Sequence, residues 1–157
     1  MTNIYFSTSE RINALELAVE SWLGTPFVPN AAIKGHGVSC QKLVGHILIE
    51  SGFLPAGFEL PAEPMNWSQA HNDSLLEQFM ARHADRFANV ELPAYQNALP
   101  GDVLGIRYGG CVHHCGLVLS VGSFVHCLRD RGVIISHLRE PVYMRLVKKI
   151  WRPLQGA

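Results

Sequence analysis

The sequence lacks an excess of either charge, since its 13 lysines and arginines balance its 13 aspartates and glutamates. A balanced charge gives no electrostatic attraction to nucleic acid or to an anionic membrane surface. The sequence also lacks an apolar run of the roughly 18 residues that a membrane span requires, and it does not open with a basic segment followed by an apolar run. We therefore expect no nucleic-acid partner, no membrane span, and a protein that is cytoplasmic as synthesised.

Internal repeats and low-complexity segments are absent as well, and residues 1–157 match the size of a single domain with a substantial core. Cysteine is scarce, with four residues in the chain. Without an export signal, these thiols are expected to be reduced rather than joined in disulfides. They are Cys40, Cys111, Cys115 and Cys127.

Helical patterns dominate the first half of the chain. Apolar residues recur at helical spacing from position 12 to position 22, after Ser7 and Glu10 in a capping-box arrangement. Another amphipathic stretch runs from about 67 to 83, with Asn72 or Asp73 as its cap. The proline-rich segment between these helices, 53–64, has no periodicity, and we expect it to form one wall of a cleft.

Strand patterns dominate the second half. Short runs rich in β-branched and aromatic residues, separated by glycines, predict an antiparallel meander. The runs occupy positions 103–108, 113–121, 124–128 and 133–138, and positions 150–152 are predicted to add a last strand. Helices followed by strands predict an α+β fold in which the helices pack on one face of the sheet.

The segment 35–52, GHGVSCQKLVGHILIESG, predicts a glycine-rich loop that opens directly into a helix. Ser39 is the candidate N-cap, and Cys40 lies on the first turn. A thiol at this end of a helix meets backbone N–H groups and the positive end of the dipole, which favour the thiolate. Cys40 is therefore the candidate nucleophile. The alternative is a buried cysteine that packs as a small hydrophobic residue.

Two histidines on neighbouring predicted strands are candidate partners for this thiol, because a thiolate nucleophile needs a base and usually a polar group that orients the base. Strand alternation places His114 and Gly116 on one face. If a three-residue loop ends at Gly122, His126 faces Gly116 and lies diagonal to His114. If a two-residue turn starts at Gly122, His126 lies opposite Leu119 and the pair is broken. The sequence leaves both registers open.

A structural zinc site is the competing interpretation of this region. The spacing between Cys111 and Cys115 is within the range that zinc sites use, but a second ligand pair at comparable spacing is missing. Strand alternation also puts neighbouring candidates on opposite faces. The candidate zinc ligands are Cys111, His113, His114, Cys115, His126 and Cys127.

Short motifs follow one another in a fixed order along most of the chain. They are WLGTPF at 22–27, GVSC at 37–40 with LV at 43–44, PGDV at 100–103, HCGLVL at 114–119 and FVHC at 124–127. In order and spacing they resemble the NlpC/P60 cysteine peptidases. The GHGVSC lead-in and the insert around Asn66 and Trp67 are most similar to the phage and gene-transfer-agent branch, which comprises tail-associated cell-wall peptidases.

This resemblance implies a papain-like α+β fold and hydrolysis of peptide bonds in peptidoglycan stem peptides, commonly between D-glutamate and the diamino acid that follows. It implies that Cys40 is the nucleophile, His114 the general base and His126 the polar residue that orients the base. It implies no metal ion and no organic cofactor. For the phage branch it further implies phage tail proteins as partners and a place in the virion tail.

The motifs depart from the family pattern around the nucleophile. Ser39 stands where the family usually has aspartate, Gln41 and Lys42 stand where it has serine and glycine, and Phe27 replaces a frequent tyrosine. In relatives that aspartate and tyrosine help to bind the substrate. The resemblance therefore makes Phe27, Ser39 and Gln41 the candidate substrate-binding residues.

Two other functions fit the same sequence. The altered residues around Cys40 are compatible with a structural phage tail or assembly component that keeps the fold with little catalysis. A thiol nucleophile also serves acyl transfer in general, so an acyltransferase or an amidase on another substrate is the third hypothesis.

Overall fold

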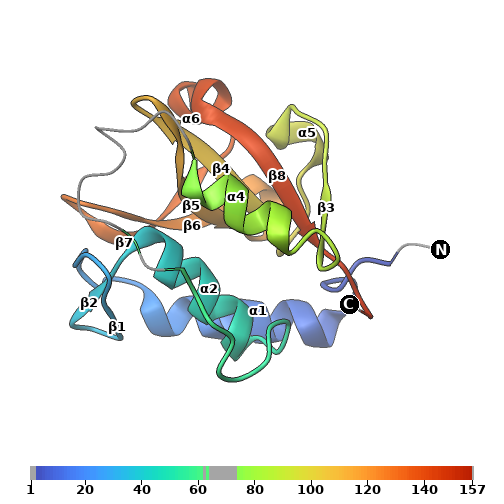
Figure 1. Cartoon of the computed structure of the whole chain (residues 1–157), viewed down its shortest axis with the longest axis horizontal. Coiled ribbons are helices and arrows are strands. Elements are labelled where there is room, and N and C mark those ends of the chain that lie inside the picture. Colours follow the sequence, from blue (N-terminus) through green and yellow to red (C-terminus); the bar gives the residue numbers. More distant parts are fainter. Residues whose placement is uncertain (1–2, 62, 64–73, 157) are drawn as a thin grey trace.

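A six-stranded antiparallel sheet lies at the centre of the structure, a computed structural model that describes residues 3–61, 63 and 74–156 (Figure 1). The strands pair in the order β3-β8-β4-β5-β6-β7. Their bounds are β3 (Phe87–Asn89), β4 (Val103–Tyr108), β5 (Cys111–Val118), β6 (Ser123–Leu128), β7 (Gly132–His137) and β8 (Val147–Pro153). A separate small hairpin, β1 (Ala32–Ile33) and β2 (Gly37–Val38), lies in the loop that precedes Cys40.

The predicted meander is confirmed, because β4, β5, β6 and β7 pair in sequence order with antiparallel register. The last predicted strand, β8, is present but lies between β3 and β4, so it is the second strand from one edge of the sheet. The sequence analysis did not predict β3. Its three residues are too few to show the alternation by which a strand is recognised.

The helices α1 (Ser9–Trp22), α2 (Cys40–Glu50) and α4 (Leu75–Arg82) pack on one face of the sheet. Figure 1 shows α1 and α2 running beside each other beneath the strands. Their apolar sides join Leu117 and Val125 of the sheet in one buried cluster. This arrangement confirms the predicted α+β fold. No helix in the described part of the chain is long and apolar enough to cross a membrane.

A second buried cluster lies on the opposite face of the sheet, around Leu104, Phe124 and Ile150. Two short helices, α5 (Ala94–Asn97) and α6 (Pro141–Leu146), contribute to it. These helices were not predicted from the sequence, because four and six residues are too few to reveal a helical period. The sheet is therefore covered on both faces, with the longer helices on one of them.

The N-caps of α1 and α4 differ from the predicted residues. Thr8, rather than Ser7, is the N-cap of α1, and its hydroxyl accepts the N–H three residues later. Ser74 is the N-cap of α4 and accepts in the same way. The predicted caps Asn72 and Asp73, and the stretch before them, lie outside the described residues.

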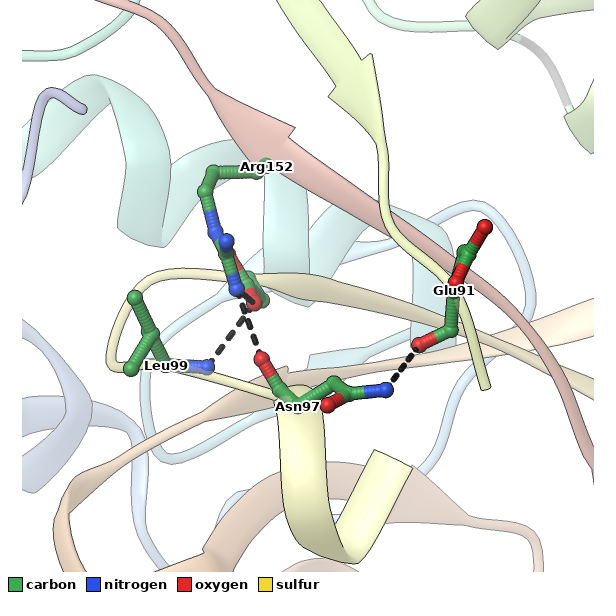
Figure 2. Close-up of polar contacts among 5 residues, drawn as sticks. Glu91, Asn97, Leu99 and Arg152 are labelled. Atoms are coloured by element: carbon green, nitrogen blue, oxygen red, sulfur yellow. Dashed lines mark hydrogen bonds and ion pairs between the residues drawn. The ribbon is translucent and has the colours of Figure 1, made fainter. Parts of the chain in front are cut away.

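A buried ion pair joins the PGD turn before β4 to strand β8. Nε and Nη2 of Arg152 donate to the two carboxylate oxygens of Asp102 at 2.9 and 2.7 Å, and Asp102 is 1% exposed. Figure 2 shows Arg152 also reaching the carbonyl of Asn97, whose side chain bonds to the carbonyl of Glu91, and shows the N–H of Leu99 pointing at the carboxylate. Burial raises the pKa of Asp102, and hydrogen bonds from Arg152 and Leu99 oppose that rise.

We expect Asp102→Ala to lower the free energy of unfolding by about 3–5 kcal/mol, because it leaves the Arg152 guanidinium without its buried partner. Urea denaturation measures this loss. Glu77→Ala is the matched control, since it breaks the more exposed Glu77–Lys149 pair and should cost less than about 1 kcal/mol. Equal small losses in the two variants would contradict the role given to the buried pair.

Candidate active site

The predicted position of the candidate nucleophile is confirmed, because Cys40 is the first residue of α2. The loop before it is held by the β1–β2 hairpin and by a bridge between Phe27 and Val38. Ser39 occupies the N-cap position as predicted, but its hydroxyl makes no capping hydrogen bond. Instead, Glu63 supplies the capping oxygen: its Oε1 accepts the N–H of Gln41 at 3.1 Å.

Cys40 opens into a cleft of about 320 Å³ between α2 and the end of the sheet that carries β5 and β6. The three predicted substrate-binding residues, Phe27, Ser39 and Gln41, all line this cleft. The segment 53–64 contributes Glu63 to its wall, in agreement with the expectation for that segment. The other lining residues are Pro29, Tyr108, His113, His114, Cys127, Leu128, Arg129 and Asp130.

The hairpin between β5 and β6 adopts the register that pairs the two histidines. Residues Ser120–Gly122 form η1, a short 3-10 turn that ends with Gly122 at a φ of 76°. His126 consequently lies opposite Gly116, which brings its ring diagonally to that of His114. A side chain at Gly116 would collide with Phe124, since a Cβ there would lie 2.8 Å from that ring. The glycine thus lets Phe124 pack beside the two histidines.

The two histidines and a serine form a linear hydrogen-bond chain. Nε2 of His114 lies 2.9 Å from Nδ1 of His126, and Nε2 of His126 lies 2.8 Å from Oγ of Ser136. If His114 carries its proton on Nε2 and donates to His126, then His126 donates in turn to Ser136. This tautomer leaves the lone pair of His114 on Nδ1, the nitrogen available to accept a proton from the cleft.

The thiol of Cys40 points to acceptors other than His114. Its Sγ lies 3.9 Å from the carbonyl oxygen of His113 and 3.9 Å from Oε1 of Glu63. Among the described residues no hydrogen bond joins Sγ to the His114 ring. The structure therefore brings Cys40 and His114 to one cleft without closing the thiol–imidazole bond, a bond that commonly tightens only when substrate is bound.

Burial keeps both histidines neutral at pH 7. It lowers the pKa of His114 well below its usual value, with further lowering from His126 and His113, and it lowers the pKa of His126 to about 4. A neutral imidazole can accept a proton, which is what a general base must do. The electrostatics of the site therefore suit His114 to that role.

The other cysteines near the cleft are poor nucleophiles at neutral pH. The Sγ of Cys115 donates to the carbonyl of Cys40 at 3.3 Å, and that of Cys127 donates to the carbonyl of Val38 at 3.4 Å. A hydrogen bond with Cys40, followed by burial, raises the pKa of Cys115, and burial raises the pKa of Cys127 to about 12. Among the described residues, no group of three histidine, cysteine or acidic side chains could hold a metal ion.

The sequence analysis did not identify three residues of this site. Ser136 could have been found, since alternation along β7 directs it to the same face of the sheet as His126. Glu63 could not, because no periodic pattern in an irregular segment indicates where its side chains point. Arg129 lines the cleft just beyond β6 and stacks over the ring of Phe27, with its guanidinium carbon 5.6 Å from the ring centre.

Comparison with known sequences gives little for this chain. No family model matches it. A 50-residue segment, 32% of the chain, is 36% identical to part of the p-hydroxybenzoic acid efflux pump subunit AaeB of Pectobacterium parmentieri, of which it covers 8%. A match of that extent carries no argument about the fold or the function of the chain.

Comparison with solved structures is more informative. An NlpC/P60 family protein from Bacillus cereus matches 91% of the chain with a TM-score of 0.58 at 19% identity. The NlpC/p60 domain of the peptidoglycan hydrolase SagA matches 90% at 0.55 and 13% identity. The peptidoglycan hydrolase RipB of Mycobacterium tuberculosis matches 93% at 0.55 and 16% identity. The chain spans 40%, 97% and 66% of these three structures. The chain therefore has the fold of the NlpC/P60 proteins, which confirms the predicted papain-like α+β architecture.

Proposed function

We propose that this chain is a cysteine peptidase that hydrolyses peptide bonds in the stem peptides of peptidoglycan. The observation that carries the proposal is the meeting of Cys40, at the start of α2, with the His114–His126–Ser136 chain in one open cleft. Two of the structural neighbours, SagA and RipB, are peptidoglycan hydrolases, which supports the same substrate class.

The proposed mechanism begins with transfer of the Cys40 proton to Nδ1 of His114. The thiolate attacks the carbonyl carbon of the scissile bond, and the oxyanion is stabilised by the N–H of Cys40 and a second donor from the preceding loop. His114 then gives its proton to the leaving amine, and a thioester remains on Cys40. Water attacks the thioester, which releases the new carboxylic acid and restores the thiol.

The bond we propose is the one between D-glutamate and the diamino acid that follows it. Two synthetic stem peptides test this choice, one with the natural γ-linked D-glutamate and the other with α-linked L-glutamate. We expect chromatography to show cleavage of the first peptide only, at the glutamyl bond. Cleavage elsewhere, or of the second peptide alone, would contradict the proposed specificity.

We propose His126 as the residue that positions His114. His126→Ala should lower kcat by about 10²-fold, the typical effect of a misplaced catalytic group, while KM stays close to its wild-type value. His126→Asn should recover much of the loss, because an amide can still accept the hydrogen bond of His114. Steady-state kinetics on the stem peptide measures both variants. A rise in KM with kcat unchanged would show that His126 acts in substrate binding instead.

A further inference from the structure

Glu63 reaches the candidate nucleophile from a segment that lies outside the helix and the sheet. Its Oε1 accepts the N–H of Gln41 at 3.1 Å and lies 3.9 Å from Sγ of Cys40. Among the described residues, this carboxylate is the only acidic side chain that accepts a hydrogen bond from the Cys40 thiol. The first turn of α2 therefore carries a carboxyl group of the same chain beside the nucleophile.

Two contacts fix Glu63 in this place. The side chain of Asn30 pairs with its backbone, because Nδ2 of Asn30 donates to the carbonyl of Glu63 and Oδ1 accepts the N–H at 2.8 Å. Leu60, in the same segment, packs directly over Gly45 of α2, where a Cβ would lie 2.4 Å from the Leu60 side chain. Glycine at position 45 thus allows the segment to lie close to the helix.

The charge of Glu63 has no close cationic partner. No ion pair in the described part of the chain includes Glu63, and neither its Oε2 nor the Oγ of Ser39 has a hydrogen-bond partner of normal geometry, although both atoms are buried. Burial raises the pKa of Glu63, opposed by the nearby Ser39 hydroxyl, the Gln41 N–H and the Lys42 charge. Above that raised pKa the carboxylate is a negative charge next to the thiol.

We propose that Glu63 is a further positioning residue of the site, whose carboxylate accepts the hydrogen bond of the Cys40 thiol and slows the reaction of Cys40 in the free protein. A negative charge about 4 Å from the sulfur disfavours a second negative charge there. An oxyanion formed at the start of α2 would be stabilised by the same N-terminal end of the helix that the Glu63 carboxylate occupies. Glu63 therefore also has to move away when Cys40 attacks a carbonyl. This inference rests on the proposed function in one respect, that Cys40 is the nucleophile.

Several other charged or titratable groups face Cys40. Strand β5 brings three of these groups to Cys40, namely His113, His114 and Cys115, and the end of β4 brings Tyr108. Cys127 of β6, with Arg129 and Asp130 beyond that strand, completes the cleft. Lys42 lies on the same helix. Among the described acidic residues, only Glu63 accepts a hydrogen bond from Sγ.

The test is the rate at which neutral iodoacetamide alkylates Cys40, followed by peptide mass mapping across pH. The other three cysteines are buried, so the native protein reports mainly on Cys40. Glu63→Gln keeps an oxygen for the Gln41 N–H and removes the charge. We expect the rate at pH 7 to rise at least about fivefold, the effect of one unit charge at 4 Å in a water-like dielectric, and the difference from the wild-type rate to narrow as the pH rises.

Two matched variants complete this test. Glu59→Gln changes an exposed glutamate of the same segment and should leave the rate unchanged. Asn30→Gly removes the clamp on Glu63 and tolerates the φ of 55° at that position, so it should also accelerate alkylation. An unchanged or slower rate in Glu63→Gln would overturn the inference, as would equal acceleration by Glu59→Gln. Alkylation needs no substrate, so failure of the peptidase proposal would be seen separately, as absence of peptide cleavage.

Discussion

Replacement of Cys40 by alanine is expected to lower kcat for stem-peptide cleavage by at least about 10⁴-fold, the scale of loss when a covalent nucleophile is removed. No other thiol can take its place. Cys115 and Cys127 are buried and remain protonated at neutral pH, and their sulfurs donate to backbone carbonyls. Chromatographic detection of cleaved peptide measures the loss.

The fold should survive this change. The Cys40 side chain is only partly buried, and its hydrogen bonds at 3.9 Å are long and weak. We expect the circular dichroism spectrum and the melting temperature of Cys40→Ala to match those of the wild type. Cys111→Ala is the matched control, because it removes a thiol outside the cleft and should retain activity. Full activity in Cys40→Ala would show that another group attacks the substrate.

Replacement of His114 by alanine is expected to lower kcat by about 10²–10⁴-fold, the usual contribution of a general acid and base. The loss follows from two roles, since the same ring accepts the thiol proton and later protonates the leaving amine. His113→Ala is the matched control on the same strand. Its ring bonds to the carbonyl of Tyr108, whereas the ring of His114 bonds to His126, so the control should lose far less.

The pH dependence of the wild type gives an independent check on His114. Burial lowers the pKa of this histidine, so the ring stays neutral at pH values where an exposed histidine is already protonated. The acid limb of kcat/KM, which reports the free enzyme, should therefore lie well below pH 6.5. A limb at or above that pH, or loss of activity in His113→Ala as large as in His114→Ala, would contradict the assignment of the base.

The sequence was sufficient to predict the helix that presents Cys40 and the meander that carries the two histidines. Both rest on local periodicity, in the apolar side of α2 and in the alternation along β5 and β6. The register of the β5–β6 hairpin could not be decided in advance, because two turn lengths were both compatible with Gly122. The observed turn, with Gly122 at positive φ, selects the register that joins His114 to His126.

The remaining parts of the site depend on contacts between residues far apart in the chain. Ser39 is of a residue type that N-caps favour, yet the capping oxygen comes from Glu63, which lies 22 residues beyond the Gln41 N–H that it accepts. The placement of Glu63 depends on Asn30 and on the close packing of Leu60 against Gly45. No local pattern encodes such a contact, because each partner is fixed only by the folded chain. The strands near Cys40 were therefore predicted correctly, and the loop residue Glu63 was not predicted.

The most direct test of the proposed peptidase is digestion of purified peptidoglycan by the wild-type protein in water enriched in oxygen-18, with mass spectrometry of the released fragments. We predict new fragments in which one oxygen-18 atom is present in the new glutamyl carboxylate and the diamino acid carries a new free amine. The same fragments should be absent with Cys40→Ala. Intact stem peptides after incubation with folded wild-type protein, or acyl groups transferred to another acceptor without oxygen-18, would contradict the account.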